Sequence, residues 1–370
     1  MYISPTILFV LSSEWPYEQI RILTSEMKIR AYHLDHLERL CGDRGIFEHA
    51  LGLVRREDHG YCTDDNARLL VIMTREPLDP VSRRLTRLAL GFVLSSQAPD
   101  GQIFNRMDSN GAWIDSASTE DCWGRALWAL GTAAAHHDDP WIRRRARLGF
   151  NHSVTQRSVW PRAMAFAALG AADVVASYPD HSTARSLLVD ALSIIPPLGD
   201  DSRWPWPEGR LRYANAALAE AVLAAGAALE MPDEIERGLA MLRWLLNRET
   251  AGDVLSVVGA SGSGPDDPVP QFDQQAIEVA ALADACWRAF SITADQSWLG
   301  GVSAAGSWFE GKNDVGLPMF DRISGGGFDG LHEDRVNQNQ GAESTLAYIA
   351  TAQRVVAVTQ SRMRGIMIEL

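Results

Sequence analysis

The feature that most constrains the fold is the alternation of two kinds of helical segment from about residue 29 onward. Stretches rich in Ala and Leu alternate with more highly charged stretches, and loops containing Gly, Pro, Asp and Trp separate them. No segment shows the sustained polar and apolar alternation, bounded by hairpin turns, that a β-rich domain requires. The sequence therefore predicts an all-α chain.

The first kind of segment starts with a polar or aromatic cluster and continues as an apolar helix of small residues. These starts are residues 63–68, 118–123, 158–162, 208–215, 272–275 and 337–344. Ala, Leu and Gly allow helices to approach closely, so we expect these six to be inner helices. The second kind is amphipathic and suits outer helices that are solvated on one face. It comprises residues 81–96, 140–150, 183–195, 233–247 and 294–309.

Successive inner starts are roughly 40 to 70 residues apart, the length of one helical hairpin and a loop. We therefore predict six hairpins closed into an α/α toroid, the (α/α)6 fold. A helix near residues 32–40 would be the outer partner of the last inner helix. The predicted domain covers residues 29–370, residues 1–28 are interpreted as an appended segment, and residues 262–268 as a rim loop.

Charge and cysteine content limit the possible partners. The 34 Lys and Arg residues face 47 Asp and Glu residues, and a net charge of −13 disfavours nucleic acid. Cys41, Cys62, Cys122 and Cys286 form no CxxC pair and have no His at metal-ligand spacing, so we expect no disulfide, metal or cofactor. No stretch reaches the roughly 20 apolar residues of a membrane helix, and no signal peptide is recognised. We expect a cytoplasmic protein without a membrane partner.

Two strings carry a specific resemblance, HGYCTDDNAR at His59–Arg68 and NQNQGAESTL at Asn337–Leu346. They resemble an α/α-toroid family found alone or fused to bacterial glycosyltransferases. Weaker matches are Trp160–Ala167, Trp204–Glu208, Phe272–Gln275 and Trp308–Asp314, with departures at Pro207 and Glu310. Over residues 33–356 the resemblance implies a toroid and a carbohydrate context, and it leaves a glycosyltransferase as one candidate partner. It implies no particular reaction.

Carboxylates at the helix starts suggest glycosidic chemistry, which uses one protonated and one ionised carboxyl group. Glu343 follows an amide-rich turn and precedes an apolar helix that would desolvate it, so we predict it to be the general acid. Asp64 or Asp65 is the predicted base, and Glu208 and Asp273 are further catalytic candidates. A helix-capping role remains open for Asp64, Asp65 and Glu343.

Amide, arginine and aromatic side chains at the same starts are predicted to contact the substrate. They are Asn66, Arg68, Trp160, Arg162, Trp204, Trp206, Tyr213, Asn215, Gln274, Gln275, Asn337, Asn339 and Gln340. Amides both donate and accept hydrogen bonds, as sugar hydroxyls require. Trp204 and Trp206 are either sugar platforms or a plug of the ring.

Other charged and glycine-rich features have simpler interpretations. Arg125 is expected to pair with Glu120 or Asp121 one turn earlier on its own helix. The glycine run at residues 325–327 is interpreted as a flexible lid or turn.

The leading hypothesis is an inverting glycoside hydrolase acting on an oligosaccharide. A phosphorylase or lyase is an alternative, in which Arg68, Arg162 and Lys312 would hold phosphate or a uronate. A non-catalytic glycan-binding partner of a glycosyltransferase is another. A sugar epimerase is weaker, because His59 and His332 are the only histidines near the rim motifs.

Overall fold

The computed structural model describes residues 32–368, with side chains up to residue 362, so the predicted appendage at residues 1–28 lies outside the described residues. The helices are α3 (Asp35–Leu40), α4 (Thr63–Arg75), α5 (Pro80–Ser95), α6 (Asp121–His136), α7 (Pro140–Ser153), α8 (Pro161–Ser177), α9 (Ser182–Ile194), α10 (Asn215–Leu229), α11 (Pro232–Arg248), α12 (Ala276–Thr293), α13 (Trp298–Phe309), α14 (Ala342–Ile368) and the short 3-10 helix η1 (Glu57–His59). All six predicted inner helices are present where their start clusters place them.

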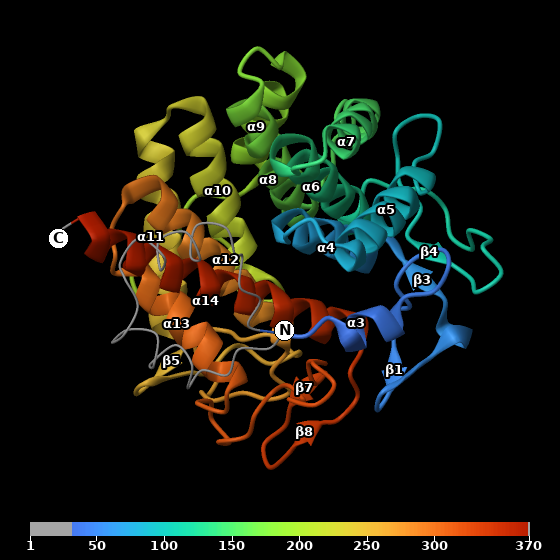
Figure 1. Cartoon of the computed structure of the whole chain (residues 1–370). Helices are drawn as coiled ribbons and strands as arrows, with labels where there is room; N and C mark the ends of the chain where they lie inside the picture. The colour runs from blue at the N-terminus through green and yellow to red at the C-terminus, as the bar shows by residue number, and fades with distance from the viewer. Residues whose placement is uncertain (1–31, 369–370) are drawn as a thin grey trace. The chain divides into compact units, whose positions relative to one another are not determined.

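The inner helices form a closed ring within the described residues. Helices α4, α6, α8, α10, α12 and α14 pack in succession, and α14 packs against α4 to close the ring (Figure 1). Each of α5, α7, α9, α11 and α13 packs on the inner helix that precedes it, and α3 packs on α14. The fold is therefore an (α/α)6 toroid, and the predicted pairing of the helix near residues 32–40 with the last inner helix is confirmed.

Outer helices begin where local signals place them. The Asp79 side chain accepts a hydrogen bond from the Ser82 amide at 2.8 Å, and the Ser82 hydroxyl accepts one from the Asp79 amide, which forms a capping box at α5. Asp139 caps α7 in front of Pro140. Helix α13 starts later than predicted because Ala294, with φ of 57°, ends α12 in the left-handed region.

Helices α6 and α8 approach each other closely through glycines. A Cβ atom at Gly131 would lie 2.3 Å from the carbonyl oxygen of Gly170, and one at Gly170 would lie 2.1 Å from that of Leu127. Neither position can hold a larger residue without separation of the two backbones. This contact explains why inner helices are built from small residues.

The strands are two-residue antiparallel pairs. They are β1 (Ala50–Leu51) with β2 (Val54–Arg55), β3 (Tyr61–Cys62) with β4 (Arg106–Met107), β5 (Thr250–Ala251) with β6 (Val254–Leu255), and β7 (Gly330–Leu331) with β8 (Val336–Asn337). Strand β3 leads directly into α4, and β8 lies five residues before α14. These strand pairs hold the loops that carry side chains close to the starts of the inner helices.

Candidate active site

A cleft of about 440 Å³ opens at the amino-terminal ends of the inner helices. We call it the carboxylate cleft because seven carboxylates line it against three arginines. The carboxylates are Glu48, Asp64, Asp65, Asp121, Asp273, Asp329 and Glu343, and the arginines are Arg68, Arg106 and Arg125. The excess of negative charge favours neutral or cationic ligands over anions.

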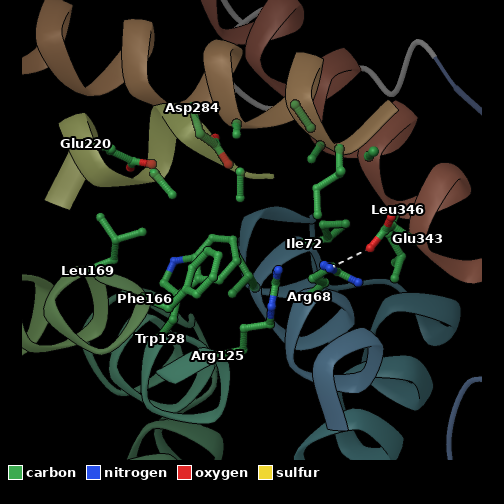
Figure 2. Close-up of a pocket in the computed structure, with 18 of the residues that line it drawn as sticks. Arg68, Ile72, Arg125, Trp128, Phe166, Leu169, Glu220, Asp284, Glu343 and Leu346 are labelled. Carbon is green, nitrogen blue, oxygen red and sulfur yellow. Dashed lines mark hydrogen bonds and ion pairs between the residues drawn. The ribbon is translucent and has the colours of Figure 1, made fainter. Parts of the chain in front are cut away.

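Arg68 joins the first and last inner helices across this cleft. Its Nη1 donates to Asp65 Oδ1 at 2.5 Å. Its Nη2 donates to Glu343 Oε2 at 2.7 Å, the contact that Figure 2 shows. Asp65 is buried, and burial raises its pKa to about 6 although Arg68 opposes the shift. The Glu343 side chain is 43% exposed, so it faces the cleft.

Asp64 faces the side of the cleft formed by α6. Its Oδ2 accepts a hydrogen bond from Asn105 Nδ2 at 3.1 Å, and its Oδ1 lies 3.5 Å from Arg125 Nε. Arg125 therefore pairs with α4, and the predicted pairing with Glu120 or Asp121 is wrong. No side-chain hydrogen bond caps α4 at Cys62, so the capping role left open for Asp64 and Asp65 is not observed there.

Asp273 reaches the same cleft from the loop before α12. Its side chain is 36% exposed, and Oδ1 lies 3.5 Å from His332 Nδ1. Oδ1 is a buried atom without a hydrogen-bond partner, and burial raises the pKa of this carboxyl. A Cβ atom at Gly330 would lie 2.3 Å from Asp273 Oδ1, so a larger residue there would displace this carboxyl group.

The sequence did not single out Asp329 or Glu48 as cleft residues. Asp329 Oδ1 accepts hydrogen bonds from the Gly341 amide at 2.8 Å and from Ser344 Oγ at 2.6 Å, and so braces the turn that carries Glu343. The preceding residues 324–327 are buried, and the Gly325 amide donates to the Asp321 carbonyl at 2.8 Å, so of the two interpretations of this glycine run the structure shows the turn and not the flexible lid. The sequence alone does not indicate which helix start the turn at Asp329 and Gly330 packs against.

An apolar lumen lies below the carboxylate cleft. Its volume is only about 60 Å³, and Ile72, Trp128, Phe166 and Leu169 are among the residues that line it. The guanidinium of Arg125 lies 4.1 Å from the centre of the Phe166 ring. Figure 2 shows the Arg68 and Glu343 pair at one side of the lumen, with Glu220 and Asp284 on the side away from Glu343. A sugar ring cannot enter so small a space, so ligands reach the cleft from the rim.

A second cavity, of about 530 Å³, adjoins the cleft at the start of α8. We call it the α8 rim cavity; it is lined by Asn105, Glu120, Asp121, Cys122, Trp160, Pro161, Arg162, Glu208, Arg212 and Tyr213. Arg162 donates to both carboxylate oxygens of Glu208, at 2.7 and 2.8 Å. Asp121 and Tyr213 line both cavities, and the Tyr213 hydroxyl donates to Asp121. Glu208 is thus not brought together with Glu343.

Several side chains that were predicted to contact the substrate are buried. Trp204 and Trp206 are buried with their ring centroids 5.0 and 5.7 Å from that of Trp244 on the outer helix α11, and neither of them lines the apolar lumen. Four predicted amides are also buried and hydrogen-bonded within the protein: Asn66, Asn215, Gln274 and Gln340. Asn339 accepts a hydrogen bond from the Gly52 amide. Gln275 and Asn337 do line the carboxylate cleft.

The four cysteines are buried and unpaired within the described residues. Glu48, Cys62 and Asp65 bring one potential metal-ligand atom each to within 4.8 Å of one another. Cys62 Sγ donates to Asp65 Oδ2 at 3.1 Å, and burial raises the pKa of this thiol well above its ordinary value. The absence of a metal therefore stays a prediction. Between residues 32 and 368, no helix combines the length and apolar character needed to cross a membrane.

Solved structures similar to this chain share its helical toroid. A sugar epimerase from a ruminal bacterium matches with a TM-score of 0.66 and 10% identity, over 92% of this chain and 98% of its own. The cellobiose 2-epimerase of Bacillus thermoamylovorans matches with a TM-score of 0.67 and 10% identity over the same shares. The GH76 α-mannanase of Bacteroides thetaiotaomicron matches with a TM-score of 0.58 and 10% identity, over 94% of this chain and 95% of its own.

At these identities the likeness establishes the fold. No family model matches the sequence, and no curated protein matches it.

Proposed function

We propose that this chain is a glycoside hydrolase that cleaves an oligosaccharide with inversion at the anomeric carbon. The observation that carries the proposal is the placement of two unlike carboxyl groups, Asp273 and Glu343, in one cleft. Burial raises the pKa of Asp273, whereas Glu343 accepts a hydrogen bond from Arg68. Two carboxyls in contrasting environments are the arrangement that acid and base roles require.

The structure favours Asp273 as the general acid in place of Glu343. An arginine only donates hydrogen bonds, so Oε2 of Glu343 is an acceptor and its carboxyl group lies beside a cation. Asp273 has a partly exposed side chain in the cleft and a raised pKa, the properties of a proton donor to the leaving oxygen.

Glu343 is then the base that takes a proton from the attacking water. Asp64 is the alternative base, although its side chain is less exposed than that of Glu343, and Asp65 positions Arg68.

The names of similar structures support a carbohydrate substrate. They include the sugar epimerases and the α-mannanase described above, and also a family 9 endoglucanase. The epimerases make epimerisation the second candidate, and the 3.5 Å contact of His332 with Asp273 is the observation that favours it. Against it, His49 is the single histidine among the described residues that line the carboxylate cleft.

Phosphorolysis has less support, because the arginines that would hold phosphate already have carboxylate partners. Arg68 binds Asp65 and Glu343, Arg162 binds Glu208, and Lys312 lies 3.0 Å from Asp253. An incoming phosphate would have to displace one of these pairs.

The test is a screen of mannose-, glucose- and galactose-containing oligosaccharides, with and without phosphate, in which NMR follows the anomer first released. We expect phosphate-independent hydrolysis with inversion, and Asp273→Asn and Glu343→Gln should each lower the turnover rate by roughly 10²-fold or more. Asp253→Asn is the control, because Asp253 lies on the turn between β5 and β6 and forms an exposed ion pair with Lys312. This variant should be as active as wild type. Solvent deuterium entering the sugar without hydrolysis would replace this proposal with epimerisation, and binding without any reaction would leave a glycan-binding protein.

A further inference from the structure

Trp160 is an exposed aromatic residue held in a concave part of the rim. It is 57% exposed and lines the α8 rim cavity. Its backbone is extended, with φ of −95° and ψ of 122°, as the following Pro161 requires, and its amide donates to Ser158 Oγ at 3.1 Å. Proline and this hydrogen bond fix the position from which the indole ring projects.

Other side chains of this cavity are held in place by contacts within the protein. Arg162 is buried and makes four hydrogen bonds, two to Glu208 and one each to the Tyr213 carbonyl and Asn215 Oδ1. Its guanidinium also lies 5.0 Å from the centre of the Tyr213 ring. A cavity of about 530 Å³ bounded by such fixed groups has the size and preorganisation of a small-molecule site.

The charge of this cavity indicates which ligands it accepts. The Arg162 and Glu208 charges neutralise each other, which leaves Glu120 and Asp121 against Arg212. Arg162 has no role left in binding a phosphate or a sugar acid. A neutral ligand with hydroxyl groups and an apolar face suits the combination of carboxylates, Asn105 and the Trp160 ring.

The cavity also adjoins the proposed reaction site. Tyr213 and Asp121 line both the carboxylate cleft and the α8 rim cavity, and their hydrogen bond forms the boundary between the two. A chain of sugars cleaved beside Asp273 and Glu343 would therefore extend across this boundary to Trp160.

We infer that the α8 rim cavity is a subsite for a neutral sugar unit, stacked on Trp160, that lies away from the bond cleaved in the carboxylate cleft. This inference rests on the proposed function for the identity of the cleft. It implies that the substrate is longer than a disaccharide and that Trp160 determines the preference for chain length.

The experiment measures calorimetric binding of manno- and cello-oligosaccharides of two and four units to the Asp273→Asn protein. In the series that binds, we expect the tetrasaccharide to bind more tightly than the disaccharide. Trp160→Ala should weaken tetrasaccharide binding by about tenfold or more and leave disaccharide binding unchanged. Trp160→Phe, which keeps an aromatic face, should retain most of the advantage.

Trp141→Ala is the matched control, because Trp141 is 55% exposed on the outer helix α7 and lines neither cavity. The subsite is overturned if Trp160→Ala weakens disaccharide and tetrasaccharide binding equally. It is also overturned if the tetrasaccharide binds no more tightly than the disaccharide in either series. Tighter binding of a uronate tetrasaccharide would overturn its neutral character. Because binding is measured without turnover, the subsite can be tested even if the protein does not hydrolyse these oligosaccharides.

Discussion

Loss of Asp284 should weaken the ring. It lies on α12 where the lumen ends, and its side chain is only 8% exposed. Arg75 of α4 donates to it at 3.0 Å, and Arg354 of α14 donates to its other oxygen. One carboxylate therefore holds arginines from two neighbouring inner helices, and the pairing holds its pKa at about 2 although burial acts in the opposite direction.

Asp284→Asn keeps the shape of the side chain and removes its charge. Two arginines that are each 17% exposed then lose their principal carboxylate. Removing one partner of a buried ion pair costs about 3–5 kcal/mol. With an unfolding entropy of about 0.7 kcal/mol/K for a domain of this length, the melting temperature should fall by roughly 4 to 7 °C.

Differential scanning calorimetry at pH 7 measures this change. Asp253→Asn, which removes an exposed ion pair, should have the same melting temperature as the wild type. Adding Arg354→Met to Asp284→Asn should recover part of the loss, because one uncompensated charge is removed. An Asp284→Asn protein that melts within about 1 °C of wild type would refute the assignment of this pair as a structural tie.

Three further predictions follow from contacts elsewhere in the fold. Gly170→Ala should separate α6 from α8 and lower the free energy of unfolding by about 1–3 kcal/mol. Gly300→Ala on α13, where no atom lies within 4 Å of the added methyl group, should be neutral or stabilising by up to about 1 kcal/mol. Equal melting temperatures of the two variants would disprove the close packing of α6 on α8. Burial raises the pKa of Glu278 to about 7 and that of Asp65 to about 6, above their unfolded values near 4, so protonation favours the folded state. The free energy of unfolding by urea should accordingly rise as the pH is lowered from about 8 to 5, and a steady fall would contradict these shifts. EDTA and reducing agent should leave the melting temperature unchanged, and a metal-dependent shift would direct attention to Glu48, Cys62 and Asp65.

The helix starts were predictable from sequence because their causes are local. Pro161, the Asp79 cap and the run of small residues after Asn215 each act within a few residues of where they lie. Their spacing also predicted the number of hairpins, since each hairpin must bury an apolar inner face. The all-α class, the inner and outer sets and the toroid were therefore available without coordinates.

The site was only partly predictable, because a side chain's role depends on what packs against it from distant parts of the chain. Sequence placed Glu343, Asp64, Asp65 and Asp273 at helix starts, and the fold brings all four into one cleft. The indole rings of Trp160 and Trp206 look equivalent in sequence, yet Trp160 is exposed and Trp206 is stacked on Trp244.

Only the tertiary structure decided that Arg68 holds Glu343, 275 positions away, and that burial raises the pKa of Asp273. Local sequence determined which segments became helices, whereas the charge environment of each carboxylate arose when the ring closed.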